Sequence, residues 1–372
     1  MFSYYGLQLY WWFLVSLIGG LLVFMMFVQG GQTLLYTLGK TEDERDLIIN
    51  SLGRKWELGF TTLVMFGGAL FAAFPLFYAV SFGGAYYLWM GILFCFIIQA
   101  VSYEYRKKPN NLFGEKFYEW LLFINGSVGI FLIGVAIGTL YKGGYFVVDD
   151  MNLSHWTKSS YGLEAILEPF NIIFGLVLVY LARVQALLYF YNNLKDISIE
   201  KRVLELLKRE FFIFLPLFLI LVAMIFLQDG YGYDKSGVIF KESQKLLHNI
   251  LKYPILAGIL VGGVLSFLYG IYLALIKHNK KAIWFSGLGT VAIVTILLLI
   301  LGINHTVYYP SLSSLQSSLT IENSSGSPYT LEVMSGVTLM LPFVLGYIFL
   351  VWRSMDKKPL SIEEVKNDPH HY

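Results

Sequence analysis

Charged residues divide this 372-residue chain into a series of uncharged, strongly apolar segments. The first 39 residues contain no Asp, Glu, Lys or Arg, and residues 58–103 form a second uncharged run. A membrane-crossing helix needs about 20 predominantly apolar residues, so the second run is long enough for two helices joined at the turn-prone sequence Ser81-Phe82-Gly83-Gly84. The pattern predicts nine transmembrane helices, at about 7–28, 58–79, 84–103, 119–141, 169–192, 211–228, 255–276, 282–303 and 333–352.

The composition agrees with this pattern and excludes an ordinary soluble domain. Hydrophobic residues make up 56% of the chain, charged residues only 14%, and the mean hydropathy is +0.62, whereas soluble domains are about one quarter charged. A weak internal repeat occurs at an offset of 156 residues, since Val28-Gln29 aligns with Val184-Gln185 and Glu44-Arg45 with Glu200-Lys201. Duplicated halves are common in membrane folds. We therefore expect a single all-α integral membrane domain, residues 1–372, built as two four-helix bundles plus one peripheral helix.

The loops predict how the chain is oriented in the membrane. If the odd-numbered helices run from outside to inside, the inner loops and the C-terminal tail hold 20 of the 27 Lys and Arg residues, and the outer loops hold 6. Arg183, within the fifth helix, is the remaining one. Inner loops of membrane proteins are enriched in Lys and Arg, so we expect the N-terminus outside and the C-terminus inside.

The sequence lacks the residues of several kinds of site. Cys95 is the only cysteine, which excludes an intrachain disulfide and a cysteine-based metal site. The net charge of +2 is spread over many loops, so no nucleic-acid partner is expected. The histidines, none of them near the middle of a predicted helix, are His155, His248, His278, His305, His370 and His371. Imidazole ligation of a membrane haem needs a histidine that faces the bundle interior, so we expect this chain to ligate no haem and no metal.

Three carboxylates lie at the inner ends of predicted helices. Glu57 opens the second helix, Glu104 closes the third and Glu119 opens the fourth. A charge within the hydrocarbon costs about 2.5–3.5 kcal/mol, so each of them needs an explanation. In one interpretation their side chains simply reach back to the interface. In the other they take up protons from the inside water, and all three are therefore proton-transfer candidates.

Further polar residues accompany these carboxylates. Arg183, in the sequence Leu-Ala-Arg-Val-Gln, is the most deeply embedded charge, and we expect Glu57 or Glu104 to neutralise it. The glutamines within the helices, Gln29, Gln32 and Gln185, are expected to form a continuous row of polar groups, the polar file, which cannot itself take up or release protons. The supporting polar residues, in addition to Arg183, are Trp56, Gln29, Gln32, Gln185 and Arg106.

Four segments occur in an order that is typical of one membrane protein family. They are the charged turn 41–45 with Ile48-Ile49-Asn50-Ser51, the pair Trp56-Glu57 with the run from Gly67 to Pro75, the stretch Tyr103-Glu104-Tyr105-Arg106, and the outer segment 318–334. Together they resemble subunit II of the cytochrome bd quinol oxidases. The likeness extends from Trp11-Trp12 to the last predicted helix.

This resemblance implies a function and a set of partners. In that family a related subunit I ligates haem b and haem d, oxidises quinol and reduces dioxygen to water. Subunit II is its haem-free partner, needed for assembly and associated with proton uptake from the cytoplasmic side, and in some members it holds a structural quinone. The resemblance thus implies a heterodimer with subunit I in the bacterial cytoplasmic membrane, with lipid, quinol and small accessory subunits as further partners.

The sequence departs from the family pattern in two places. The family commonly has an acidic residue late in the first helix, where this chain has Gln29 and Gln32, and it commonly reads Trp-Asp-Gly-Asn-Gln at the start of the second helix. This chain reads Trp56-Glu57-Leu58-Gly59-Phe60 there, which keeps a carboxyl group. A secondary transporter built from repeated helix bundles and a pure assembly scaffold without a proton role are the alternatives.

Overall fold

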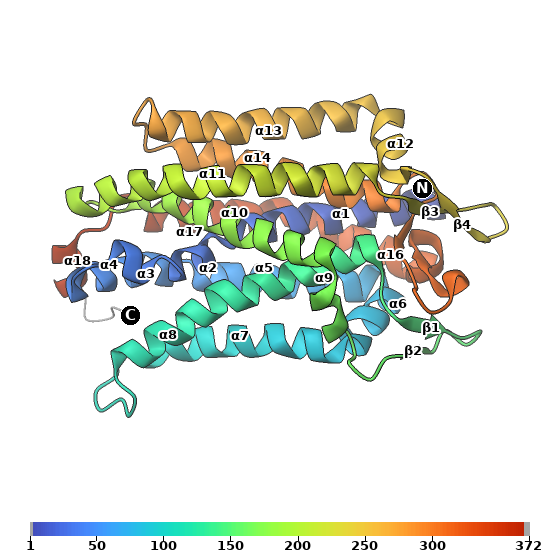
Figure 1. Cartoon of the computed structure of the whole chain (residues 1–372), viewed down its shortest axis with the longest axis horizontal. Helices are drawn as coiled ribbons and strands as arrows, with labels where there is room; N and C mark the ends of the chain where they lie inside the picture. Colours follow the sequence, from blue (N-terminus) through green and yellow to red (C-terminus); the bar gives the residue numbers. More distant parts are fainter. Residues whose placement is uncertain (1–2, 368–372) are drawn as a thin grey trace.

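The computed structural model describes residues 3–367, which form an array of long, roughly parallel helices with short strands at one end (Figure 1). The strands and the N-terminal end of the first helix lie at what we call the strand end, and the last short helix lies at the opposite, tail end. The predicted number of spans is confirmed, because nine helical stretches of the described chain are long and apolar enough to cross a membrane. These are Tyr4–Gln32, Glu42–Ala73, Tyr86–Tyr105, Glu115–Lys142, Pro169–Asn193, Ile197–Leu227, Pro254–Leu275, Ala282–Gly302 and Pro328–Met355.

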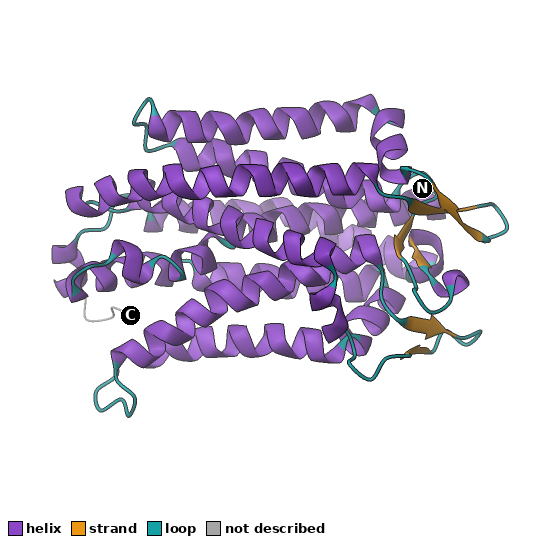
Figure 2. Ribbon diagram, in the orientation of Figure 1, coloured by secondary structure: helices purple, strands orange, loops and turns teal. Residues whose placement is uncertain are grey.

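Four of these stretches consist of more than one helix, as Figure 2 shows in part, and the other five are continuous. The divided stretches contain α1 (Tyr4–Met25) and α2 (Phe27–Gln32), α4 (Glu42–Gly53) and α5 (Trp56–Ala73), α8 (Glu115–Ile124) and α9 (Ile130–Lys142), and α16 (Pro328–Val337) and α17 (Leu341–Met355). The continuous helices are α7 (Tyr86–Tyr105), α10 (Pro169–Asn193), α11 (Ile197–Leu227), α13 (Pro254–Leu275) and α14 (Ala282–Gly302).

Shorter elements connect the long helices. The short α-helices are α3 (Leu35–Leu38), α6 (Pro75–Tyr78), α12 (Lys245–Lys252), α15 (Ile321–Ser324) and α18 (Ile362–Asn367). Three antiparallel pairs of strands stand at the strand end: β1 (Phe146–Val148) with β2 (Ser154–Trp156), β3 (Gly230–Tyr233) with β4 (Ile239–Glu242), and β5 (Val307–Tyr309) with β6 (Leu319–Thr320).

The second span ends differently from its prediction. The sequence predicts one helix over 58–79, but α5 ends at Ala73 and Phe74 leaves the helical region, with φ −131° and ψ 65°. The cause is Pro75, because the residue before a proline is sterically disfavoured in the α conformation. The chain resumes as α6 and then as a π-helix, Ala79–Gly84, which occupies the place of the predicted tight turn. A wider helical turn, rather than a tight loop, therefore leads into α7.

The charged segment after the first span is helical. Thr41 caps α4 in a capping box, in which its hydroxyl accepts from the Glu44 backbone N–H and the Glu44 carboxylate accepts from the Thr41 N–H. The same carboxylate is bound by Arg202 and accepts from the Ser198 hydroxyl at 3.0 Å, both at the start of α11. The Glu44 side chain therefore caps the start of α4 and joins two regions that lie more than 150 residues apart in sequence.

The core lies between the first, fourth, fifth and eighth spans, which are the most buried ones. Within its most apolar window, 72% of the first span is buried, whereas only 22% is buried for the spans that contain α5, α11 and α13, and none for the last span. A Cβ placed on Gly134 of α9 would lie 2.5 Å from the Gly175 Cα of α10, so the two backbones touch at that point. Small residues at such crossings are typical of membrane helix packing.

The outer segment 318–334 that carries part of the family resemblance packs against the first helix. Thr320 and Asn323 form a second capping box at α15, and the Gln8 amide donates to the Ser325 hydroxyl at 2.7 Å. The Trp11 indole donates to the Leu331 carbonyl at 3.2 Å. This segment thus joins the first helix to the start of the last span at the strand end.

Candidate functional site

The tail end of α7 and α8 contains a buried ionic cluster centred on Arg106. Its guanidinium binds Glu119 with Nη2–Oε1 2.7 Å and Asp46 with Nη2–Oδ1 2.6 Å, and the Glu119 side chain is only 1% exposed. The Tyr36 hydroxyl donates to Glu119 Oε2 at 2.7 Å, and Arg45 lies 3.5 Å from the same oxygen. The interpretation that Glu119 reaches back to the interface is therefore wrong, because two arginines and a phenol hold it inside the protein.

Two groups of the cluster, Arg106 and Tyr36, have pKa values above their ordinary ones. Burial lowers the pKa of Arg106, but the neighbouring Asp46 and Glu119 outweigh it and hold that pKa above its ordinary value. Burial and the hydrogen bond to Glu119 raise the pKa of Tyr36 to about 12. Arg106 thus remains charged and Tyr36 neutral near pH 7, as expected of an anchor that fastens α8 to α4 and α7.

A second buried cluster consists only of uncharged groups. The Gln29 and Gln32 amides each donate to Gln99 Oε1 at 2.9 Å, and Gln32 also donates to the Tyr103 hydroxyl at 3.1 Å. Asn125, at the π-helical turn between α8 and α9, donates to Gln32 Oε1 at 3.0 Å and to Gln99. This cluster, which we call the amide cluster, stands where the family commonly has a first-helix carboxylate, and its amides cannot exchange protons near pH 7.

Gln185 does not belong to this group, so the expected continuous polar file is wrong at that position. Its amide donates to the Thr290 hydroxyl at 2.6 Å and to the Ser286 carbonyl at 3.1 Å, both on α14. Gln29 instead contacts α7. The two glutamines related by the internal repeat therefore bind different helices.

Arg183 has a different partner from the one expected. Its guanidinium makes a two-pronged contact with Glu210 of α11, with Nε–Oε2 and Nη2–Oε1 both 2.8 Å, and it donates to Thr33 at 3.0 Å. Arg209 also binds Glu210, at 2.9 Å. The prediction that Glu57 or Glu104 neutralises Arg183 is wrong, because the neighbouring helix supplies a carboxylate.

Glu57 and Glu104 lie at the tail end, on the surface of the protein. The residues before them are in contact, since the rings of Trp56 and Tyr103 stack with centroids 5.6 Å apart and planes 13° apart. The two carboxylates therefore occupy the same level of neighbouring helices, α5 and α7. Both side chains are exposed, and no hydrogen bond or ion pair joins either of them to another residue of the described part of the chain.

A third ionic contact fastens the last span. Lys55 is completely buried and donates to Asp356 Oδ1 at 2.9 Å. Asn193, at the end of α10, donates to the same oxygen at 2.9 Å and accepts from the Ser51 hydroxyl at 3.0 Å. This contact links α4, α10 and the residue that follows α17.

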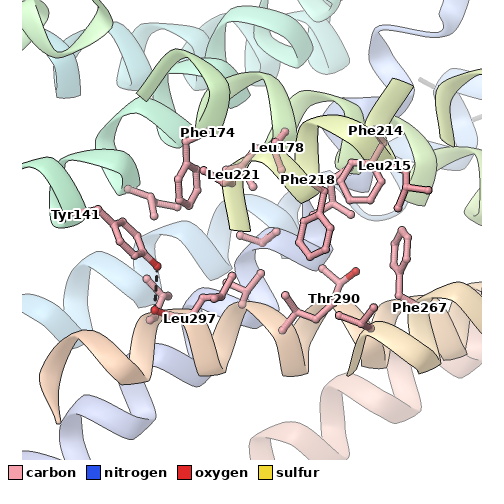
Figure 3. A pocket seen from close by; sticks show the side chains of 18 of the residues that line it. Tyr141, Phe174, Leu178, Phe214, Leu215, Phe218, Leu221, Phe267, Thr290 and Leu297 are labelled. Carbon is pink, nitrogen blue, oxygen red and sulfur yellow. Dashed lines mark hydrogen bonds between the residues drawn. The ribbon is translucent and has the colours of Figure 1, made fainter. Parts of the chain in front are cut away.

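An apolar cavity of about 60 Å³ lies between α1, α9, α10, α11, α13 and α14 (Figure 3). Figure 3 shows Phe174, Phe214, Phe267 and their neighbours around it. Its two hydroxyl-bearing side chains are engaged: Tyr141 donates to the Leu297 carbonyl at 2.9 Å, and Thr290 accepts from Gln185. The cavity thus presents an apolar surface to whatever enters it.

The sequence interpretation missed Gln99, Asn125 and Glu210. The first two are single amides within uncharged apolar runs, and a polar residue at membrane depth is by itself a sign of a partner on another helix. Glu210 is the last charge before the apolar part of α11, which is the position that a buried arginine on the preceding helix requires.

These features define a polytopic helical membrane subunit whose buried ionic contacts gather at one end. A family model described as "Cytochrome bd terminal oxidase subunit II" matches residues 7–355. The chain belongs to that family.

Curated relatives and a solved structure agree with this assignment. The chain is 29% identical to cytochrome bd-I ubiquinol oxidase subunit 2 of Escherichia coli (strain K12) over 387 residues, which cover 100% of this chain and 99% of the relative. It is 27% identical to cytochrome bd ubiquinol oxidase subunit 2 of Bacillus subtilis (strain 168), over 87% of this chain and 89% of that one. A chain in the structure of the bd oxidase from Geobacillus thermodenitrificans shares the fold, with a TM-score of 0.63 at 16% identity over 94% of this chain and 98% of that chain.

The protein is therefore a multi-pass membrane subunit of a bd-type terminal oxidase and works together with a subunit I. The family assignment sets the transporter alternative aside.

Proposed function

We propose that this chain is the haem-free subunit of a quinol-oxidising bd complex, that its tail end faces the cytoplasm, and that Glu57 and Glu104 take part in proton uptake there. The observation that carries the proposal is the state of these two carboxylates. They follow Trp56 and Tyr103, whose rings stack, at the tail end of the molecule, and no ion pair to a cation of the described chain neutralises them. A group that exchanges protons has to be reachable and free to change its charge.

The third candidate, Glu119, has a structural part in this proposal. It is bound by Arg106, Arg45 and Tyr36, and removing a buried carboxylate from such a cluster would leave buried cations unpaired. Deeper in the protein, Gln29 and Gln32 cannot accept a proton near pH 7. The route for protons in this chain therefore begins at Glu57 and Glu104 and does not continue through the amide cluster.

The haems, of types b and d, belong to subunit I in this proposal. The histidines that the structure describes stand in strand β2, in the short helix α12 and in loops, which are His155, His248, His278 and His305. His370 and His371 lie outside the described residues. Small accessory subunits, lipid and quinol complete the expected set of partners.

A structural quinone does not fit the apolar cavity of this chain. The cavity measures about 60 Å³, whereas a cavity that accepts a benzene ring measures about 150 Å³. Of its two hydroxyl groups, that of Tyr141 already donates to the Leu297 carbonyl, and the rest of the lining is apolar apart from Thr290. We therefore assign no quinone to this place.

Neutral, isosteric variants of the intact complex test the proton role. Glu57→Gln and Glu104→Gln should each slow oxygen reduction by about 100-fold, the lower end of the range for a lost proton-transfer group, while haem content stays unchanged. Glu205→Gln is the matched control, because Glu205 is an exposed carboxylate of α11. Like Glu57 and Glu104, it lies where the sequence predicts the inner side of the membrane. If oxygen consumption is the same in all three variants, the chain acts as a scaffold and the proton role is refuted.

A further inference from the structure

A short basic segment follows the last span at the tail end of the molecule. Directly after α17 come Asp356, Lys357 and Lys358. The Asp356 carboxylate is held inside the protein, since Lys55 and Asn193 both donate to its Oδ1 at 2.9 Å. The two lysines are exposed, and no ion pair or hydrogen bond joins their side chains to another residue of the described chain. Their positive charges therefore have no counterion among the residues that the structure describes.

Lys357 and Lys358 line an open hollow of about 420 Å³. The other lining residues are Arg54, Ser354, Met355 and Glu364. Arg54, at the end of α4, donates to Glu364 Oε1 at 3.2 Å and to the Met355 carbonyl at 3.4 Å, so three cations share one carboxylate in this hollow. A water molecule occupies about 30 Å³ in the liquid. The hollow is therefore large enough for an anionic group of several atoms together with its hydration.

The backbone around the hollow is fixed by contacts with other elements. The Leu360 N–H donates to the Asn193 carbonyl at 2.7 Å, and the Lys195 N–H donates to the Leu360 carbonyl at 2.9 Å. Beyond it, α18 packs against α4, where Lys366 binds Asp43 at 2.7 Å. The basic segment therefore has a defined shape without a ligand, and a site formed in advance loses less entropy on binding.

Two tryptophans indicate that the hollow lies at the level of the membrane surface. The rings of Trp352, in the last turn of α17, and Trp284, at the start of α14, have centroids 5.9 Å apart. The Lys55 ammonium group, whose partner Asp356 precedes the two lysines, lies 5.1 Å from the centroid of the Trp352 ring. Tryptophan is enriched at the boundary between hydrocarbon and water, at the level of the lipid head groups. Basic pockets at this level are typical binding sites for anionic head groups.

The cations have a purely structural alternative role at the end of α17. Positive charges near a helix C-terminus are favoured by the helix dipole, and Arg353 occupies the last turn of α17. That role accounts for cations close to α17, but it requires no hollow and no contribution from Arg54 of α4. Donors that converge from two elements on one open space are what an anion with several oxygen atoms requires.

We propose that this hollow binds a phosphate-bearing anion, and that the anion is the head group of an acidic phospholipid such as phosphatidylglycerol. Lys357 and Lys358 bind the phosphate oxygens, and the acyl chains follow α17, none of whose residues is buried within the described chain. Free inorganic phosphate offers the same chemistry, so the experiment has to distinguish the two sources. The proposal assigns no partner to Glu57 or Glu104 and is independent of their proton role.

Photo-labelling of the intact two-subunit complex tests the site. The probe is phosphatidylglycerol with a photoreactive diazirine near the head of one acyl chain, added to the complex in phosphatidylcholine nanodiscs. Mass spectrometry identifies the labelled peptides, and we expect label in residues 353–364. Lys357→Gln/Lys358→Gln should lower this labelling by at least about fivefold, the loss expected for one basic side chain at an anionic membrane surface.

Two further variants serve as controls. Lys277→Gln/Lys281→Gln removes two exposed lysines from the loop between α13 and α14, which do not line the hollow, and should leave the labelling unchanged. Glu364→Gln removes the carboxylate that lines the hollow and should raise the labelling, whereas damage to the fold of α18 would lower it. Haem content and oxygen consumption are recorded for every variant, so that loss of the complex is distinguished from loss of the lipid.

Two parallel samples identify the source of the phosphate. In one, the photoreactive lipid is phosphatidylcholine, which should label residues 353–364 far less. In the other, an excess of inorganic phosphate is present and should leave the phosphatidylglycerol label in place. Complete displacement by inorganic phosphate would overturn the lipid source and assign the hollow to free phosphate. Equal labelling by the two lipids, or in the two double-lysine variants, would overturn the site and leave the lysines with the helix-dipole role alone.

Discussion

The surface of α5 and α7 and that of α11 and α13 are built alike but differ in where their charges lie. In both, fewer than half of the residues in the most apolar part of each long helix are buried, and the spans that contain α5, α11 and α13 have the same small buried share. On α11 the carboxylate Glu210 turns inward and is bound by Arg183. On α5 and α7, Glu57 and Glu104 are exposed and have no ion-pair or hydrogen-bond partner in the described chain. The comparison teaches that helices with the same small buried share can either bind a carboxylate inside the chain or leave it exposed.

The largest expected effect is the loss of stability when the arginine of a buried ionic contact is removed, and it is compared between Arg106 and Arg183. Arg106→Ala leaves Glu119 buried and short of its main cation, and breaking a buried pair in this way costs about 3–5 kcal/mol. Arg183→Ala should cost about 1–3 kcal/mol, because Arg209 still binds Glu210. The thermal unfolding midpoint of the purified complex measures both.

The double variant Arg106→Gln/Glu119→Gln is the control for this comparison. It removes both charges together, so it should recover part of the stability that Arg106→Ala loses. Equal losses of stability for Arg106→Ala and Arg183→Ala would contradict the expectation that the contacts of Arg106 contribute more to stability than those of Arg183.

An intermediate effect is expected from a carboxylate placed on the α13 surface. Leu265→Glu should reduce the amount of chain in the membrane, since a carboxylate facing lipid costs about 2.5–3.5 kcal/mol. Leu265→Gln carries no charge and serves as the matched control. Immunoblotting of membrane fractions gives the measurement, and a normal level of the Leu265→Glu variant would show that this surface is covered by protein or water.

The smallest effect concerns the connection that leads into α13. Burial raises the pKa of Glu242, but Lys245 and His248 outweigh it, so its folded pKa lies below its ordinary value. The carboxylate therefore contributes stability above its unfolded pKa of about 4.5, and this contribution disappears as the pH falls through the folded pKa. Glu242→Gln should lower stability by at most about 1 kcal/mol at pH 7.

The pH dependence provides the check on this last expectation. Unfolding midpoints of the Glu242→Gln and unaltered complexes should converge as the pH is lowered from 7 to 4. A difference that persists or grows toward acid pH would show that the side chain acts through packing and not through its charge.

The sequence predicts the spans well because each has a run of apolar residues bounded by charge. The number of spans is confirmed for the described part of the chain. The break at Phe74 was accessible as well, since Pro75 marks it. The two-bundle arrangement and the orientation of the termini stay predictions, supported by the internal repeat and by the distribution of Lys and Arg.

The partners of the candidate residues were harder to predict for a physical reason. A one-dimensional pattern places Glu57, Glu104 and Glu119 at the same depth, but their environment depends on how α5, α7 and α8 rotate about their axes. Glu119 points to Arg106, whereas the other two point outward. Rotation is set by side-chain packing between helices, which neither hydropathy nor charge spacing contains.

The contact between Lys55 and Asp356 has a consequence for the biogenesis of the chain. The two residues are 301 positions apart, so Lys55 is synthesised long before Asp356. Its ammonium group therefore lacks this counterion until translation is nearly finished. A truncated product that ends before Asp356 retains an unpaired buried cation, which is strongly destabilising. Asp356, directly after the final span, thus completes this pairing late in synthesis, and we expect chains that lack it to be less stable in the membrane.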